Sequence, residues 1–419
     1  MTSPARRLPL HYAWVIVFTG ILTLFSCLGL GRFALGMLLP SMSRSLALGY
    51  TQMGMISTGN FIGYLAGVLI CGRLVRRFRA RRIIVAGLLG VGTSMIGLSA
   101  LSTFPALLTC YFVTGLGSGL ANVAMMGLVA HWFTSQRRGR AAGLFITGNG
   151  FGIMLSGLLI PWLNATEGSA GWRDGWLVLG WLVLGAAVLV GILVRNDPRS
   201  MELQPLGGGA ESGAETISPS APRPLWRLVG HIGAIYLTFG FTYVIYATFL
   251  VTTLVQELGY SEGEAGRAWF WVGLLSLLSG PGFGSLSDRI GRRISLVLAF
   301  SCQTLAYLLL GFRCPGTWVY LSVVLFSLAV WSIPSIVTAM IGDYLPREAV
   351  TSAFGTITFI FGLGQVCGPT LAGLLADASG SFASSYLLAA AMTAIGIALT
   401  LLLRPPAAQP LPHPLRSRP

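Results

Sequence analysis

A strongly basic turn between two apolar stretches occurs twice in this chain, at a spacing of 212 residues. The second copy, at 284–293, reads GSLSDRIGRR, and the first, at 72–81, reads GRLVRRFRAR. The same spacing relates Gly364 to Gly152. Similarity at a fixed spacing is typical of proteins built from internal repeats. The sequence therefore predicts two similar halves, each with a basic turn after its second helix.

The stretches that flank these turns are too apolar for a soluble protein. Hydrophobic residues make up 54% of the 419 residues and charged residues 10%, whereas soluble domains carry about 25% charged residues. A membrane span needs about 20 apolar residues, and twelve such stretches can be identified. The predicted spans are 12–41, 51–71, 83–102, 105–132, 140–163, 174–194, 227–256, 263–286, 294–312, 317–342, 350–375 and 382–404.

Polar residues, glycines and prolines separate the two halves. The segment 195–226 has this composition, and we predict that it is a flexible cytoplasmic linker. It divides an N-terminal six-helix bundle, 1–194, from a C-terminal six-helix bundle, 227–404. The Pro-rich end of the chain, 405–419, is predicted to be a disordered cytoplasmic tail.

The net charge of +14 reflects orientation in a membrane rather than binding to nucleic acid. All 27 basic residues are arginines, and they lie mainly in short turns between apolar stretches. If the N-terminus is cytoplasmic, most of these turns are cytoplasmic too, as the positive-inside rule requires. We therefore expect a multi-pass protein of the cell inner membrane, with the lipid bilayer as its partner, both termini cytoplasmic and no nucleic-acid partner.

The second basic turn resembles, position by position, the G-x-L-x-D-R-x-G-R-R loop of the major facilitator superfamily (MFS). In the first copy, Arg76 and Arg79 stand where the motif has its acid and its second glycine. The segments 29–40 and 239–250 also resemble the YbfB-like branch of that superfamily, and 195–207 is loosely similar to monocarboxylate and oxalate-formate carriers. The resemblance implies an all-α membrane protein with 12 transmembrane helices, in two six-helix bundles with pseudo-two-fold symmetry. It also implies a secondary transporter that works by alternating access, not an enzyme.

The resemblance assigns a gating role to Asp288. In the family, the equivalent acid caps a helix of the other half and latches the cytoplasmic gate, because helix N-termini attract carboxylates. We expect Asp288 near Arg140 when that gate is closed; the alternative is a topology-setting loop with an incidental acid. Arg76 cannot cap a helix N-terminus, so a charge-swapped latch to Asp343 or Glu348 is a further hypothesis. The candidate gating residues are Gly72, Arg76, Arg77, Gly284, Asp288, Arg289, Gly291 and Arg292.

Arg32 is the one charge well inside a predicted span. Charges at membrane depth usually face the bundle interior and mark a substrate path, although a long side chain can also snorkel to the surface. No acid lies inside a span to pair with it, and a planar guanidinium suits a carboxylate. The candidate substrate-binding residues are Arg32, Asn60, Asn122, Asn149, Tyr243, Tyr246 and Gln365; each of the others is as readily explained by a helix–helix hydrogen bond.

The sequence thus predicts transport of a small-molecule substrate, a small organic anion, across the cytoplasmic membrane. The alternative is a multidrug efflux pump for hydrophobic compounds, which would favour an apolar pocket with buried acids. All 13 acidic residues instead lie in loops or at helix ends, so a coupling proton would have no buried carboxylate relay. The six cysteines show no metal-binding spacing. We expect a monomer with no metal and no cofactor.

Overall fold

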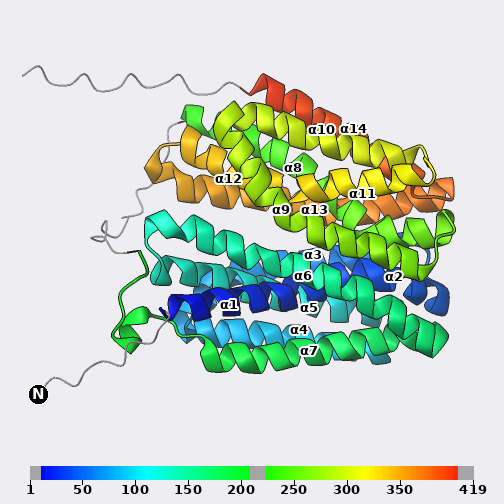
Figure 1. Cartoon of the computed structure of the whole chain (residues 1–419), viewed down its shortest axis with the longest axis horizontal. Coiled ribbons are helices and arrows are strands. Elements are labelled where there is room, and N and C mark those ends of the chain that lie inside the picture. The colour runs from blue at the N-terminus through cyan, green and yellow to red at the C-terminus, as the bar shows by residue number, and fades with distance from the viewer. Residues whose placement is uncertain (1–10, 208–222, 404–419) are drawn as a thin grey trace, which may run out of the picture.

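The computed structural model covers the whole chain and describes residues 11–207 and 223–403 (Figure 1). The predicted disordered tail, 405–419, and part of the predicted linker lie outside the described residues. Long helices run side by side in two groups, with the N-terminal half below the C-terminal half in Figure 1. Both described ends of the chain and the gap at 208–222 lie at one end of the bundle. We call this the linker end, and the opposite end the far end.

The first half consists of helices that follow the predicted spans. These are α1 (Ala13–Leu24), η1 (Phe25–Phe33), α2 (Ala34–Leu46), α3 (Tyr50–Phe78), α4 (Ala80–Ala100), α5 (Phe104–Trp132), α6 (Ser135–Glu167), η2 (Gly168–Ala170) and α7 (Gly171–Leu193). The elements α1, η1 and α2 together form the first span, in which η1 is a stretch of π-helix.

The second half repeats this arrangement after the short 3₁₀ turn η3 (Pro198–Met201). Its elements are α8 (Arg223–Thr252), η4 (Thr253–Glu257), α9 (Glu262–Ile290), α10 (Arg292–Gly311), α11 (Thr317–Val330), α12 (Ser332–Tyr344), α13 (Arg347–Ser379) and α14 (Ala383–Leu402). Helix α8 begins at Arg223, inside the range predicted as linker.

Eleven helical segments in the described part of the chain are long and apolar enough to cross a membrane. Helix α9 is not among these eleven, but it has 29 residues, and its bounds are those of α3 displaced by 212 residues. Its start is well defined, because Ser261 and Glu264 cap each other's backbone N–H groups at 2.9 and 3.2 Å. With α9 as the twelfth span, the predicted all-α fold of two six-helix bundles is confirmed.

Close contacts between the halves obey the 212-residue repeat. A Cβ atom on Gly54 of α3 would lie 2.2 Å from the carbonyl oxygen of Pro369 in α13. At the repeat-related positions, a Cβ atom on Gly266 of α9 would lie 2.3 Å from the carbonyl oxygen of Gly157 in α6. Only glycine allows backbones to approach this closely. The two crossings are therefore related by the predicted pseudo-two-fold symmetry.

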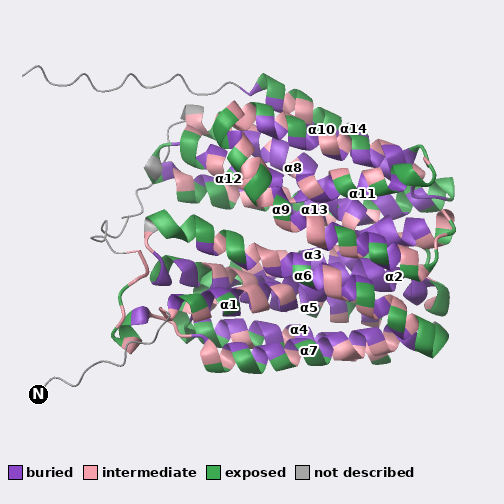
Figure 2. Cartoon of the chain, viewed as in Figure 1, coloured by how far each residue is buried: buried purple, intermediate pink, exposed green. Residues whose placement is uncertain are grey.

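The same relation holds inside each half. A Cβ atom on Gly152 would lie 2.4 Å from the Cα atom of Gly29, where α6 crosses η1. In the second half, a Cβ atom on Gly364 would lie 2.8 Å from the backbone nitrogen of Phe241, where α13 crosses α8. The glycine-rich helices of both halves thus serve helix packing. Figure 2 shows buried residues inside each half and where the halves meet.

The start of the predicted linker lies against the N-terminal half. The indole of Trp132 donates a hydrogen bond to the carbonyl of Arg195 (3.0 Å), and the backbone N–H of Leu206 donates to the carbonyl of Trp132 (2.9 Å). The amide oxygen of Asn196 accepts from the N–H of Arg81 (2.9 Å). These bonds satisfy backbone groups that are otherwise unpaired at helix ends. Residues 195–207 therefore differ from the flexible chain expected there.

Candidate functional site

Arg32 lies near the end of the π-helical stretch η1, in the middle of the first span, and the residue is 8% exposed. Short π-helical turns inside α-helices occur frequently at functional sites. This one is packed from both sides, because α6 crosses it at Gly29 and the side chain of Val91 lies 3.0 Å from where a Cβ on Gly31 would be. The packing holds Arg32 in the interior and excludes the snorkelling alternative in this conformation.

Three residues of α3 surround the guanidinium. Its Nε donates a hydrogen bond to Oδ1 of Asn60 (3.3 Å), and its Cζ lies 4.2 Å from the ring centre of Tyr64 and 4.7 Å from that of Phe61. Positions 60, 61 and 64 share one face of a helix. Aromatic faces stabilise a desolvated cation. Asn60 was among the candidates, whereas Phe61 and Tyr64 were missed because aromatic residues in a span are usually packing residues.

The backbone at Arg32 is also held by hydrogen bonds. The hydroxyl of Tyr111 in α5 donates to the carbonyl of Arg32 (2.9 Å), and the amide nitrogen of Asn60 donates to the carbonyl of Tyr111 (3.2 Å). Arg32, Asn60 and Tyr111 therefore form one connected group across three helices. One nitrogen of the guanidinium, Nη2, is buried and has no hydrogen-bond partner among the described residues.

A small cavity of about 10 Å³ lies beside Arg32, at the junction of the two halves. Its size allows about one water molecule. Ser57 and Thr248 face each other across this junction, with their hydroxyl oxygens 3.1 Å apart. The residues that line the cavity are Arg32, Phe33, Leu35, Gly36, Ser57 and Phe61 from the first half and Val244, Ala247 and Thr248 from α8.

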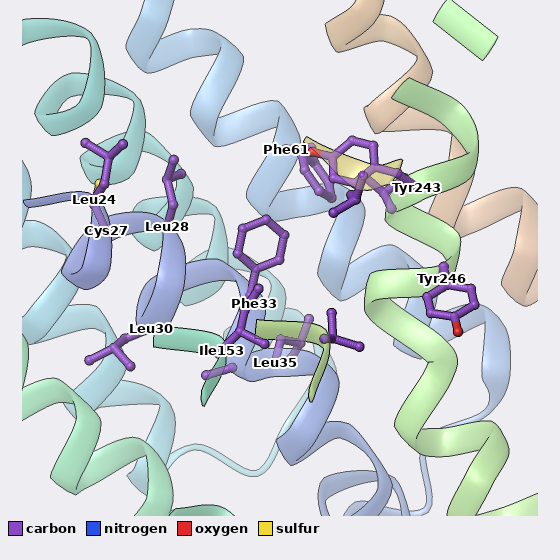
Figure 3. Packing of buried hydrophobic residues seen from close by; sticks show 14 of the residues in the cluster. Leu24, Cys27, Leu28, Leu30, Phe33, Leu35, Phe61, Ile153, Tyr243 and Tyr246 are labelled. Carbon is purple, nitrogen blue, oxygen red and sulfur yellow. The ribbon is translucent and has the colours of Figure 1, made fainter. Parts of the chain in front are cut away.

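Aromatic side chains of the second half face this region. Phe33 packs edge-on against Trp331 (centroids 5.7 Å apart), and Tyr243 packs edge-on against the same ring (6.2 Å). The amide nitrogen of Gln365 donates a hydrogen bond to the hydroxyl of Tyr243. Figure 3 shows Phe33, Phe61 and Tyr243 approaching one another from the two halves. Two more of the candidate residues, Tyr243 and Gln365, are thus on the side of α8 and α13 that faces Arg32.

The remaining candidates divide into two groups. Asn122 donates to the hydroxyl of Tyr64 (2.8 Å), so it supports the aromatic cage of Arg32, and Asn149 lies where α6 crosses η1. Both are left with an amide oxygen that is buried and unpaired among the described residues. Tyr246 is different. It stacks on Phe326 (3.9 Å) and shares a hydrogen bond with Ser322 inside the second half, and Figure 3 shows it pointing away from Tyr243.

Two candidate gating residues of the second half, Asp288 and Arg292, pair with each other at the linker end. Arg292 donates to Asp288 (2.5 Å) and to Asp343 (2.8 Å), all within the C-terminal half. The side chain of Asp288 is 66% exposed, and among the described residues it has no hydrogen bond or ion pair with α6 in this conformation. Arg76 and Arg77 have no ion pair among the described residues. A Cβ atom on Gly72 would lie 3.8 Å from the guanidinium of Arg76, whereas Gly284 borders open space. Gly291 has a positive φ of 87° that favours glycine.

An acid does cap a helix of the other half, but it is Asp377 at the far end. Its carboxylate accepts hydrogen bonds from the backbone N–H groups of Tyr50 (3.0 Å) and Thr51 (2.9 Å) at the start of α3, and from the Thr51 hydroxyl. An ion pair between Arg44 and Glu262 lies at the same end. Hydrogen bonds between the halves extend from the junction beside Arg32, where Ser57 faces Thr248, to the far end, where Figure 1 shows the two groups of helices converging. The sequence analysis did not identify Asp377.

Comparisons with known proteins were made at the level of sequence and of fold. A model of the family described as "Uncharacterised MFS-type transporter YbfB" matches residues 24–401. The chain is 25% identical over 380 residues to a hexuronate transporter of Bacillus subtilis (strain 168), covering 86% of this chain and 87% of the relative. It is 24% identical over 379 residues to a 3-(3-hydroxy-phenyl)propionate transporter of Escherichia coli (strain K12), covering 90% of each. The crystal structure of a D-xylose-proton symporter superposes with a TM-score of 0.73 at 17% identity, over 94% of this chain and 98% of that one, which shows likeness of fold.

Proposed function

The chain belongs to the family of MFS-type transporters described by YbfB, and we propose that it carries a small organic anion across a membrane by alternating access. Family membership confirms the superfamily predicted from the basic turn and the YbfB-like branch predicted from the segments 29–40 and 239–250. It also confirms that the chain is a transporter rather than an enzyme. The substrate class, the orientation and the moving parts are our proposals.

The observation that carries the proposed substrate class is the environment of Arg32. A cation at the centre of a span costs at least about 2.5–3.5 kcal/mol, and the described residues bring no carboxylate to it. Asn60 and two aromatic faces offset part of that cost, but Nη2 stays without a partner. A carboxylate or sulfonate could take this place with charge-assisted hydrogen bonds. The two relatives are named as transporters of hexuronate and of 3-(3-hydroxy-phenyl)propionate, and both of these compounds are carboxylates. This supports an organic anion as the substrate class.

The lining around Arg32 favours an anion with an organic body. Phe33, Phe61 and the ring of Tyr243 supply apolar surface, while Asn60 and Gln365 supply polar groups. We propose that the substrate's charged end binds Arg32 and that its body contacts the aromatic side chains. The cavity of about 10 Å³ is too small for such a ligand, so binding requires the two halves to separate on one side.

We propose that the linker end faces the cytoplasm, because the arginine-rich turns lie there. The halves are then joined on the outer side by Asp377 and by the Arg44–Glu262 pair. In the alternate conformation, Asp288 would leave Arg292 and approach the start of α6 near Arg140. The moving units would be the bundles 1–194 and 227–404. The protein would work as a monomer in the inner membrane. A proton is the candidate coupling ion.

A binding screen on the purified protein tests the substrate class. Small carboxylates and sulfonates are compared with their neutral amides and with amines of the same size, by thermal unfolding. A ligand at 100 times its dissociation constant adds about 2.7 kcal/mol to stability, so a binder raises the melting temperature clearly. We expect anions to stabilise the wild type but not Arg32→Gln, while the exposed Arg137→Gln keeps the response. Stabilisation by amines or apolar drugs, with none by anions, would support the efflux alternative instead.

A further inference from the structure

A basic groove lies at the linker end of the first half, away from the cavity beside Arg32. It has a volume of about 930 Å³ and lies between the start of α4 and the end of α7. These two helices form the outer edge of the N-terminal half in Figure 1. The residues that line the groove are Arg77, Phe78, Arg79, Arg81, Arg82, Val85, Ala86, Leu89, Gly191 and Asn196.

The charges of this groove are unbalanced. Arg81 is fixed to the protein, since its Nε donates to the carbonyl of Gly191 (2.7 Å). The guanidinium groups of Arg77, Arg79 and Arg82 have no hydrogen bond or ion pair within 11–207 and 223–403, and no acid lines the groove. The N-terminus of the 21-residue helix α4 begins here and adds its own positive potential. The site therefore favours an anion.

The backbone of Arg79 is strained. Its φ of 67° and ψ of 151° lie in a region that is almost restricted to glycine. The repeat-related residue in the second half is a glycine, Gly291, with nearly the same angles (87° and 152°). An arginine that only set membrane topology could stand at an unstrained neighbouring position. The presence of an arginine in this strained conformation suggests that the groove needs a guanidinium at residue 79.

The other wall of the groove is apolar and exposed. Leu89 is 42% exposed and Phe78 39%, and both line the groove. On α7, which contributes Gly191 to the groove, Val188 (62%) and Ile192 (58%) are exposed as well. A soluble phosphate ion makes no apolar contacts with this wall, whereas the acyl chains of a lipid can pack against it.

We propose that the groove binds the phosphate headgroup of an anionic phospholipid, with Arg79 and Arg82 contacting the phosphate and the acyl chains lying along the outer face of α4 and α7. The lipid would compensate the guanidinium groups of Arg79 and Arg82, at the turn from α3 to α4, and hold this first basic turn in place. The second half cannot bind in the same way, because glycine replaces Arg79 there and Arg292 is already paired with Asp288 and Asp343.

Native mass spectrometry of the purified full-length protein tests this site. Dissociation constants are measured for phosphatidylglycerol and for phosphatidylcholine with the same acyl chains, in wild type, Arg79→Gly, Arg82→Gln and the double variant. A basic side chain near an anionic lipid surface contributes about a fivefold effect. We expect each single variant to weaken phosphatidylglycerol binding about fivefold and the double variant about 25-fold, with phosphatidylcholine unchanged. Arg79→Gly should still fold, since glycine accepts the strained backbone, and Arg82→Gln provides an independent test.

Arg137→Gln is the matched control, because this exposed arginine lies at the same end but outside the groove. An equal loss in Arg137→Gln and Arg79→Gly would mean diffuse charge attraction and would overturn the proposal. Equal affinity of the wild type for both lipids would overturn it too. A third arm adds inorganic phosphate at millimolar concentration. Full competition by phosphate would show a site for soluble anions rather than for lipid.

Discussion

Replacing Asp377 by alanine should shift the protein towards conformations that are open at the far end. Its carboxylate caps the N-terminus of α3, which belongs to the other half, through the N–H groups of Tyr50 and Thr51. Removing a helix N-cap costs about 0.5–2 kcal/mol. Because these hydrogen bonds exist only when the halves meet at the far end, that free energy enters the conformational equilibrium directly.

The expected shift can be expressed as populations. A change of about 0.5–2 kcal/mol corresponds to about 2–30-fold in the ratio of open to closed molecules. A far-end-open fraction of about 1% in the wild type would then rise to about 2–25%. The carboxylate is partly exposed, so high salt should reduce the difference.

Spin labels on the two halves measure this equilibrium. We would place them at Glu167→Cys and Thr317→Cys, both exposed at the far end, in a variant without the six native cysteines. Double electron–electron resonance then gives the fractions of short and long distances. The control is Asp174→Ala, which removes an acid at the same end that has no partner across the halves among the described residues. Unchanged fractions in Asp377→Ala, or an equal shift in Asp174→Ala, would refute the latch.

Three further variants test the site and the linker end. Arg32→Lys keeps the charge but loses the planar fork, so binding of an organic anion should weaken at least about tenfold by titration calorimetry, and an unchanged affinity would remove Arg32 from the site. Tyr246→Phe loses the hydrogen bond to Ser322 and should lower stability by about 0.5–1.5 kcal/mol in thermal unfolding, with substrate affinity as in the wild type. Asp288→Asn should insert normally but slow transport in proteoliposomes, because the linker end closes less well; wild-type rates would show that Asp288, paired here with Arg292, has no gating role.

Local patterns were sufficient to predict the helices and the repeat. A stretch of apolar residues in a membrane must form helix whatever lies next to it, because its backbone groups have no water to bond. The spans could therefore be predicted one by one. The basic turns were equally visible because each is contiguous in the chain. Even the burial of Arg32 could be inferred from its distance into the first span.

The partners of each polar group depend on how the helices cross, and these crossings could not be predicted from the sequence. Phe61 and Tyr64 form the cage of Arg32 only because α3 and η1 both pack against α5, with that face of α3 towards Arg32. Tyr243 and Tyr246 lie within one turn of the same helix. Tyr243 faces the junction of the halves, whereas Tyr246 is buried inside the second half.

The sequence by itself determined that this chain is a twelve-span membrane protein of two related halves with one buried cation, because hydropathy and spacing are properties of the chain alone. Only the tertiary structure decided which end of the molecule is latched. Asp288 and Asp377 are both acids at helix ends, but in this conformation only Asp377 meets a helix N-terminus of the other half. That difference arises from the relative position of the two bundles. This position depends on a few hydrogen bonds between the bundles, and a transporter must be able to reverse it.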